Sequence, residues 1–388
     1  MAVSQETRSR ANTAQRWLGI DFSGNYRMWQ PANRASNVWI ADVRRSDDNL
    51  VLHTLQRVQQ LPGNGLPFTR LVHLLAAGQY EAAAIDAPFS VPARFVPDAG
   101  HAGLLEEVAS MALSENRPFP EAKEFVRHVT GQEPLLDPPK PLRETEDYWK
   151  RRGVNVRSTL WAGARGGAAM TAACLTLLHR AQRPIWPWSG ATAGGLLVEA
   201  FPAGQLRHWN LPHDGYDGDE DAATRRRAEI LDILSTRVEL GHFRAELRGH
   251  ADALDAVLCT FAALAVARGE IAVRPGPSAE QEGWIAVHRG IARREAGERG
   301  DSGGQQREEG AMATALVLVT ADPGKDRAVA KKVKAVPGAE GVCLVSGLYD
   351  VVATVKGSGA GEVLDTVYDK IRTIPGVRGS HTMFCTPV

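Results

Sequence analysis

The first ninety residues carry short apolar runs of strand length, separated by polar or turn-forming positions. Three such runs come first, followed by one stretch with helical spacing and then a fourth apolar run. Three strands in a meander, a helix, and a strand returning beside the first strand is the chain order of the RNase H fold. The expected elements are strands over 17–22, 38–43 and 50–54, a helix over 67–77, and a strand ending at Asp86.

From residue 91 to residue 290 the pattern predicts mainly helices. The segment 252–264 is apolar on almost every face, so we expect it to form a helix buried in the domain rather than one lying on the surface. Further helices are expected over 104–114, 120–129, 143–152, 166–180 and 222–240, together with a strand ending at Glu199 and an extended segment over 283–288.

A charged, Gly-rich stretch without apolar periodicity predicts a flexible linker over 293–311. After it, the order strand, helix, strand, strand, helix, strand predicts a ferredoxin-like (βαββαβ) α+β domain over 312–388. A polar N-terminal arm covers 1–15, which leaves 16–292 for an α/β RNase H-like domain. A chain of 388 residues exceeds one ordinary core, in agreement with two domains.

Composition narrows the classes of function. The chain has 45 Lys+Arg and 45 Asp+Glu, a balance that argues against tight nonspecific binding of duplex nucleic acid but leaves room for a local basic patch. The four cysteines are far apart without a C-x-x-C motif, so we expect no disulfide framework or zinc site and a reduced, cytoplasmic setting. The N-terminus lacks the apolar region of a signal peptide, and no apolar run reaches the roughly 18 residues of a membrane span.

Acidic residues at the ends of apolar runs are the candidate chemistry. Asp21 and Asp86 follow strand-like runs, a position suited to ligands, although each aspartate alternatively caps the turn that follows it. Asp252 and Asp255 share one face of a first helical turn, where the helix dipole also favours acids. Glu199 ends another apolar run and alternatively pairs with an arginine. If these acids converge, their crowded charges favour Mg²⁺ or Mn²⁺.

Five short motifs occur in order along the chain: G-I-D-F-S-G at 19–24, I-D-A-P at 85–88, V-E-A-F-P-A at 198–203, H-A-D-A-L-D-A at 250–256 and E-G-W-I at 282–285. Over about 16–290 they resemble the domain-of-unknown-function 429 family, whose members are predicted nucleases of the RNase H fold. The resemblance implies catalytic carboxylates, with Asp21, Asp86 and Asp255 as the metal ligands and Glu199 and Asp252 as additional members. By analogy with nucleases of this fold, two metals about 4 Å apart would activate water and stabilise the leaving oxygen.

Residues 312–388 resemble the Lrp/AsnC ligand-binding domain, also called the RAM domain, through the hairpin sequence V-S-G-L-Y-D-V-V at 345–352 and a Pro-Gly after each helix. The resemblance implies a homo-oligomer and an amino-acid effector bound near the hairpin and the last strand. The implied ligand-binding residues are Gly347, Tyr349, Asp350, Ser380 and Thr382; alternatively, Gly347 and Asp350 only form a tight turn. The helix-turn-helix that usually precedes this domain is missing, so DNA binding of the regulator kind is not implied.

These features predict a metal-dependent nuclease or related phosphoester hydrolase with an oligomerising, amino-acid-sensing domain attached. Nucleic acid is a candidate substrate, without support from the net charge. The rival hypothesis is a noncatalytic sensing or assembly protein, in which the RNase H-like domain only binds a ligand or partner. It predicts no metal affinity at the acids.

Overall fold

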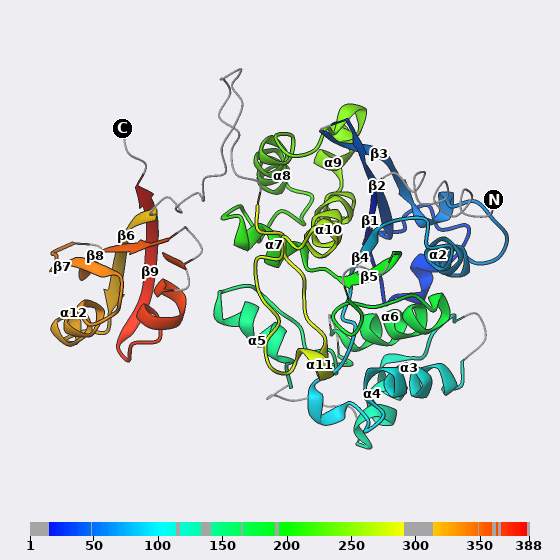
Figure 1. Ribbon diagram of the computed structural model, residues 1–388, viewed down its shortest axis with the longest axis horizontal. Helices are drawn as coiled ribbons and strands as arrows, with labels where there is room; N and C mark the ends of the chain where they lie inside the picture. The colour runs from blue at the N-terminus through cyan, green and yellow to red at the C-terminus, as the bar shows by residue number, and fades with distance from the viewer. Residues whose placement is uncertain are drawn as a thin grey trace, which may run out of the picture. The chain divides into compact units, whose positions relative to one another are not determined.

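Two compact units make up the chain, Met1–Arg293 and Arg294–Val388 (Figure 1). Each is described by itself. The expected linker and all but the last residue of the expected arm lie outside the described residues. The computed structural model describes residues 15–47, 49–113, 117–132, 141–163, 166–190, 194–290, 313–347, 349–358, 362–363 and 366–385.

A five-stranded mixed sheet with strand order β3-β2-β1-β4-β5 forms the centre of the first unit. β1 (Arg16–Asp21), β2 (Trp39–Ser46) and β3 (Asn49–Arg57) form an antiparallel meander. After the helix α2 (Pro67–Ala76), β4 (Ala82–Asp86) returns parallel to β1, and β5 (Leu196–Glu199) extends the sheet parallel to β4. This is the predicted chain order.

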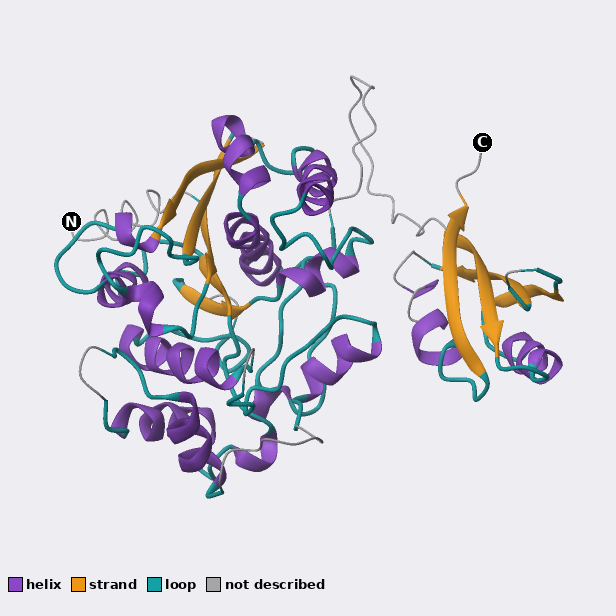
Figure 2. Ribbon diagram, turned by 180° about the vertical axis from the view of Figure 1, so that it is seen from behind, coloured by secondary structure: helices purple, strands orange, loops and turns teal. Residues whose placement is uncertain are grey.

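Helices cover both faces of this sheet, which gives three layers (Figures 1 and 2). One face packs against α10, with α7, α8 and α9 contributing to the same apolar core. The other face packs against α2 and α6, with α3 and α4 joining that core. The helices are α3 (Gly100–Ser110), α4 (Ala122–Thr130), α6 (Ala168–Ala181), α7 (Pro202–His208), α8 (Asp221–Leu234), α9 (Arg244–Gly249) and α10 (Ala251–Arg268).

The helix α10 is buried over almost its whole length, as its apolar pattern predicted. It approaches β1 closely because β1 carries Gly19. A Cβ atom at Gly19 would lie 2.0 Å from the carbonyl oxygen of Ala256 and 2.6 Å from the backbone nitrogen of Thr260. Contacts this short are not tolerated, so the glycine allows the first turns of α10 to lie directly over the end of β1.

Several details differ from the expected elements. The polar connection expected between the second and third strands is mostly strand, since β2 and β3 remain paired as far as Ser46 and Asn49. The helix α8 ends at Leu234 rather than at residue 240. The segment 283–288 forms one isolated bridge to Ile271 and is no regular strand. The short helices α7, α9 and α11 (Ala279–Glu282) were not predicted, whereas α5 (Glu144–Arg151) was.

The second unit contains a four-stranded sheet with strand order β7-β8-β6-β9. All of its pairings are antiparallel. One face of the sheet is covered by α12 and η5, which form a shared apolar core with it. The elements follow the predicted βαββαβ order: β6 (Ala313–Ala321), α12 (Asp326–Lys334), β7 (Ala339–Leu344), β8 (Val351–Gly357), η5 (Thr366–Ile371) and β9 (Val377–Cys385).

Candidate functional site

Two adjacent parallel strands of the first unit end in aspartates that lie side by side. Asp21 at the end of β1 pairs in register with Asp86 at the end of β4. Side chains alternate along a strand, so Asp21 shares a sheet face with Trp17, and Asp86 shares one with Ala84. Trp17 and Ala84 both belong to the core under α10. Both aspartates therefore point toward the face that α10 covers.

Asp255, in the second turn of α10, completes a group of three carboxylates. One carboxylate oxygen from each of Asp21, Asp86 and Asp255 lies within 4.8 Å of the other two. Asp21 is buried, with 6% of its surface exposed, and the other two aspartates are partly buried. In the described parts of the chain, no lysine or arginine forms an ion pair with any of the three. The arrangement concentrates negative charge without a bound partner cation.

This crowding shifts the titration of all three groups. Burial raises the pKa of Asp21 well above its ordinary value, and the charges of Asp255, Asp252 and Asp86 raise that pKa further. Burial and the charge of Glu199 raise the pKa of Asp86 to about 7, although Arg157 opposes them. Burial and Asp86 likewise raise the pKa of Asp255. These carboxyl groups therefore favour protonation or a neutralising cation.

Tyr216 supports the third carboxylate, a role that the sequence analysis missed. Its buried hydroxyl donates a hydrogen bond of 2.8 Å to Oδ1 of Asp255. Tyr216 lies in the acidic stretch 213–221, and it is the only aromatic residue there. That isolated aromatic residue was the one available signal. The hydrogen bond fixes the orientation of the Asp255 carboxylate toward the other two acids.

Asp252 lies beside the three acids rather than among them. It precedes Asp255 by three residues on α10 and is partly exposed. Its charge raises the pKa values of Asp21 and Asp255. Burial raises the pKa of Asp252 itself, and His250 opposes that shift. The helix spacing thus places Asp252 at the edge of the site, where solvent reaches it.

Glu199 lies elsewhere, for a reason of strand register. It pairs with Ile85 rather than with Asp86, so its side chain lies on the opposite face of the sheet, toward α6. There the Glu199 carboxylate accepts hydrogen bonds from both terminal nitrogens of Arg143 and, at 3.1 Å, from the backbone N–H of Phe89. The alternative in which this glutamate pairs with an arginine is what the structure shows.

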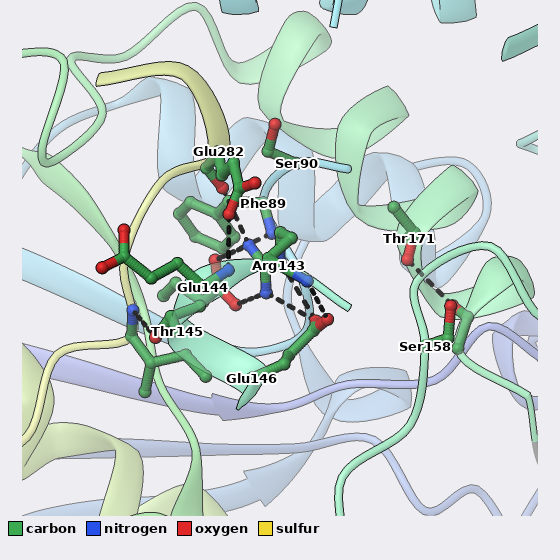
Figure 3. A network of polar contacts seen from close by, with 12 residues as sticks. Phe89, Ser90, Arg143, Glu144, Thr145, Glu146, Ser158, Thr171 and Glu282 are labelled. Carbon is green, nitrogen blue, oxygen red and sulfur yellow. Dashed lines mark hydrogen bonds and ion pairs between the residues drawn. The ribbon is translucent and has the colours of Figure 1, made fainter. Parts of the chain in front are cut away.

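Arg143 connects three segments that border the site. Figure 3 shows its buried guanidinium between Glu146 and Glu282. Its Nε donates to Glu146 at 3.1 Å, and its Nη1 donates to the backbone carbonyl of Glu282 at 3.1 Å. The Glu282 carboxylate in turn accepts the backbone N–H groups of Ala93 and Glu144, at 2.9 and 2.6 Å. The network fixes β5, α5 and α11 relative to one another.

A cavity of about 250 Å³ opens beside Asp86. Its wall includes Asp86 itself, so the cavity borders one of the three carboxylate residues. Residues of the network above, Arg143 and Glu199, line another part of it. Asn155 and Arg157, both exposed, contribute two further polar side chains to the cavity wall.

In the second unit, the predicted hairpin residues have partners within the chain. Gly347 has φ = +142°, in the region that favours glycine, as a tight turn requires. The Asp350 carboxylate accepts the backbone N–H of Ala321 at 2.7 Å, and the Asp350 N–H donates to Val319 at 3.0 Å. Tyr349 lies in the same turn. Gly347 and Asp350 thus have a structural role in the hairpin, in addition to any role in ligand binding.

The two predicted residues of the last strand lie on the helix-covered face of the second sheet. Ser380 pairs in register with Val319, and Thr382 with Val317, both of which belong to that core. Arg372 donates from Nε to the Ser380 hydroxyl at 2.9 Å. Their position places them beneath η5 rather than on the open face of the sheet.

Two family models match the chain. Residues 19–280 match the model of the family described as "Protein of unknown function (DUF429)", and residues 314–387 match the model described as "Lrp/AsnC ligand binding domain". Both resemblances drawn from the motifs are therefore confirmed. The search for membrane spans, made over the described residues, found no helix with the length and apolar character required.

Individual relatives match a small part of the chain. An uncharacterized HTH-type transcriptional regulator of Pyrococcus horikoshii is 38% identical over 73 residues, which is 18% of this chain and 49% of that protein. A similarly described regulator of Pyrococcus abyssi is 37% identical over 73 residues, with the same coverage. The chain therefore spans about half the length of the curated relatives that it matches.

The solved structures described next also match only a small part of this chain. The crystal structure of FFRP-DM1 is 28% identical and covers 19% of this chain and 99% of its own, with a TM-score of 0.19. The hypothetical protein PHS023 from Pyrococcus horikoshii is 28% identical. The match covers 20% of this chain and 92% of that protein, with a TM-score of 0.19. AsnC of E. coli is 14% identical. The match covers 24% of this chain and 62% of AsnC, with a TM-score of 0.20.

Proposed function

This chain belongs to the DUF429 family, and from that premise we propose that its first unit is an RNase H-like, divalent-metal-dependent phosphoester hydrolase. The observation that carries the proposal is the convergence of Asp21, Asp86 and Asp255 without a partner cation among the described residues. The sheet order supports it, because a meander followed by parallel strands is the order expected for that fold. Asp21 and Asp86 lie at the carboxyl ends of β1 and β4, where ligands of α/β sheets commonly bind.

The donor set fits Mg²⁺ or Mn²⁺. Both are hard cations that prefer oxygen ligands, and three carboxylate oxygens lie within 4.8 Å of one another here. Asp21, Asp86 and Asp255 would hold the cation. Burial, and next the charges of neighbouring carboxylates, raise the pKa values of all three, and a bound cation would favour their charged forms. A cation bound there would polarise a phosphoryl oxygen and lower the pKa of a bound water.

The chain's own residues have separable roles in such a hydrolysis. Water adds to phosphorus, the bond from phosphorus to the leaving oxygen breaks, and that oxygen takes up a proton. Asp252, at the solvent edge of the site, would accept the proton lost by the attacking water. Tyr216 keeps the Asp255 carboxylate oriented, and Arg157 would contact a negatively charged phosphoryl oxygen beside Asp86.

The test is hydrolysis of bis(p-nitrophenyl) phosphate by the full chain with Mn²⁺ or Mg²⁺. We expect metal-dependent turnover that falls by about a hundredfold or more in Asp21→Asn and in Asp255→Asn. Asp98→Asn, which changes an exposed aspartate, serves as the matched control and should retain activity. Turnover by the wild type no faster than by the two site variants would defeat the proposal and favour a noncatalytic binding role.

For the second unit, we propose oligomerisation and binding of an amino-acid effector. The match of residues 314–387 to the Lrp/AsnC ligand-binding model supports both roles. The candidate contacts remain Gly347, Tyr349, Asp350, Ser380 and Thr382. We further propose a cytoplasmic setting, since all four cysteines are free and two of them, Cys343 and Cys385, are exposed.

A further inference from the structure

We propose that the cavity beside Asp86 binds the single ring-shaped group of a small phosphoester, so that the substrate is a mononucleotide-sized ester rather than a long nucleic acid. This inference rests on the proposed function and specifies its substrate class. In this arrangement the phosphate lies at the three carboxylates, with Arg157 beside it. The base or comparable heterocycle lies in the cavity.

The position and size of the cavity support this assignment. Asp86 belongs both to the carboxylate group and to the cavity wall, so a phosphoester held at the acids would have one substituent at the cavity opening. The volume is about 250 Å³. Small-molecule pockets span about 300–1,000 Å³, so this cavity lies just below that range and suits one ring system rather than a larger ligand.

The chemistry of the wall suits a flat heterocycle. Apolar side chains provide most of the lining, and Asn155 offers an amide that can both donate and accept hydrogen bonds to a ring edge. Arg143 does not serve as an anion receptor there, because its donors are directed at Glu146, Glu199 and the Glu282 carbonyl. The apolar lining side chains are those of Ala87, Pro88, Val156, Met170, Ala200, Phe201 and Ile285.

Arg157 is the cation available to the phosphate. Its side chain is exposed and, over the part of the chain that the structure describes, forms no hydrogen bond or ion pair. It lines the same cavity as Asp86 and lies near enough to oppose the rise in the pKa of that aspartate. A guanidinium free of structural partners next to an acid group suits an anionic ligand that the metal and the arginine share.

The charge of the first unit favours a small substrate over a polymer. Residues 1–293 contain 33 Lys+Arg and 33 Asp+Glu, so this unit has no excess of positive charge. Binding of long nucleic acids draws most of its affinity from the neutralisation of many phosphates. A single available arginine beside one small cavity matches a ligand with one phosphate better than a strand with many.

The experiment compares three substrates with the Mn²⁺-loaded full chain: the p-nitrophenyl ester of thymidine 5′-monophosphate, bis(p-nitrophenyl) phosphate, and a single-stranded oligonucleotide. Arg157→Gln removes the cation, and Asn155→Trp obstructs the cavity opening from an exposed position. Arg225→Gln on α8 is the matched control, because Arg225 is exposed and lies outside the cavity lining. Melting curves check that every variant is folded.

We expect the thymidine ester to be the best of the three substrates. Arg157→Gln should raise its KM by about tenfold, as loss of one charge-assisted hydrogen bond predicts. Asn155→Trp should raise the same KM by a similar factor because the indole obstructs the cavity opening, and the control should match the wild type. Free thymidine 5′-monophosphate should compete. Unchanged KM values in both variants, or a higher kcat/KM for the oligonucleotide, would overturn the inference. Hydrolysis of the diester that is lost in Asp21→Asn and Asp255→Asn would still leave the proposed function standing.

Calorimetry keeps the two proposals distinguishable if no ester is hydrolysed. The proposed function would then have failed. Binding of thymidine 5′-monophosphate to the Mn²⁺-loaded chain, weakened about tenfold by Arg157→Gln but not by Arg225→Gln, would still support the cavity assignment. Absence of binding, or equal binding by both variants, would overturn it.

Discussion

Asp86 dominates the electrostatics of the site. It lies in register with Asp21, close to Asp255, and in the wall of the cavity. Its pKa is raised to about 7 because burial and Glu199 outweigh Arg157. Burial also raises the pKa values of Asp21 and Asp255, and neighbouring carboxylates raise them further, so the metal-free protein is expected to retain protons among the three close to neutral pH.

Asp86→Asn should therefore stabilise the metal-free protein above pH 7. The raised pKa means that the folded state binds more protons than the unfolded state, so wild-type stability falls as pH rises from the ordinary value of 3.8 toward about 7. Asparagine has no carboxyl group to titrate, so the Asp86→Asn variant does not lose stability in this way as the pH rises. We expect a gain of up to a few kcal/mol, at about 1.4 kcal/mol per pKa unit, measured by urea unfolding in EDTA across a pH series.

The same variant should lose stabilisation by Mn²⁺. Wild type should gain about 2.7 kcal/mol when the free metal concentration is a hundred times its dissociation constant, because the ion binds only the folded state. Asp98→Asn, the control, should behave as wild type in both experiments. Equal pH profiles for Asp86→Asn and wild type would contradict the charge crowding described here.

The three converging aspartates could be predicted from sequence because apolar runs place Asp21 and Asp86 at strand ends and helical spacing places Asp255. Glu199 could not be placed in the same way. Whether it faces α10 or α6 depends on the register of β5 against β4, and a shift of one residue reverses the face. Tyr216 depends on a loop path that local sequence does not specify.

Among the elements, the contact between β1 and α10 positions the site. Gly19 permits this contact, since a side chain there would meet the backbone of α10 at Ala256 and Thr260. The long buried helix and the strands were predictable because their patterns extend over enough residues. The helices α7, α9 and α11 were missed because they are too short to show a full helical period, and tertiary contacts fix them.

Gly19→Ala should disrupt this contact. The methyl group would overlap backbone atoms that cannot rotate away, so we expect destabilisation of about 1–3 kcal/mol or more, together with weaker Mn²⁺ binding as α10 shifts. Gly194→Ala, where a Cβ would meet no atom within 4 Å, is the matched control. Denaturant unfolding and Mn²⁺ titration provide the measurements. Wild-type behaviour of Gly19→Ala in both would refute this explanation of the close approach.

The ion-pair network joins β5, α5 and α11, and its centre should be costly to remove. Arg143→Met leaves Glu146 and Glu199 buried without their cation, which should cost about 3–5 kcal/mol of unfolding free energy. Adding Glu199→Gln should recover part of this loss, because one uncompensated charge disappears. Arg225→Met provides an exposed control. An Arg143→Met variant as stable as the wild type would show that the network contributes little to the unfolding free energy.

Taken as one chain, the protein combines a candidate hydrolase unit with a unit of the Lrp/AsnC ligand-binding type. The strands of both units occur along the chain in the order that the apolar runs predicted. The proposed metal, effector and assembly depend on partners outside the chain, which sequence patterns indicate only through family resemblance. The proposed division of labour assigns chemistry to the first unit and assembly to the second.

Light scattering should separate these two roles. We expect the full chain to form a multimer and residues 1–293 to be monomeric, because assembly is assigned to residues 312–388. Addition of amino acids should alter the size of the full chain but not that of residues 1–293. A monomeric full chain, or a multimer that persists without the second unit, would contradict the assignment.

The proposed metal site can be examined by diffraction from crystals of the full chain soaked in Mn²⁺. An anomalous difference map should show a peak within about 2.5 Å of carboxylate oxygens from Asp21, Asp86 and Asp255, and Asp86→Asn should weaken or abolish it. A map without density at these aspartates, or with manganese bound only elsewhere, would contradict the assignment of this site to metal-dependent hydrolysis.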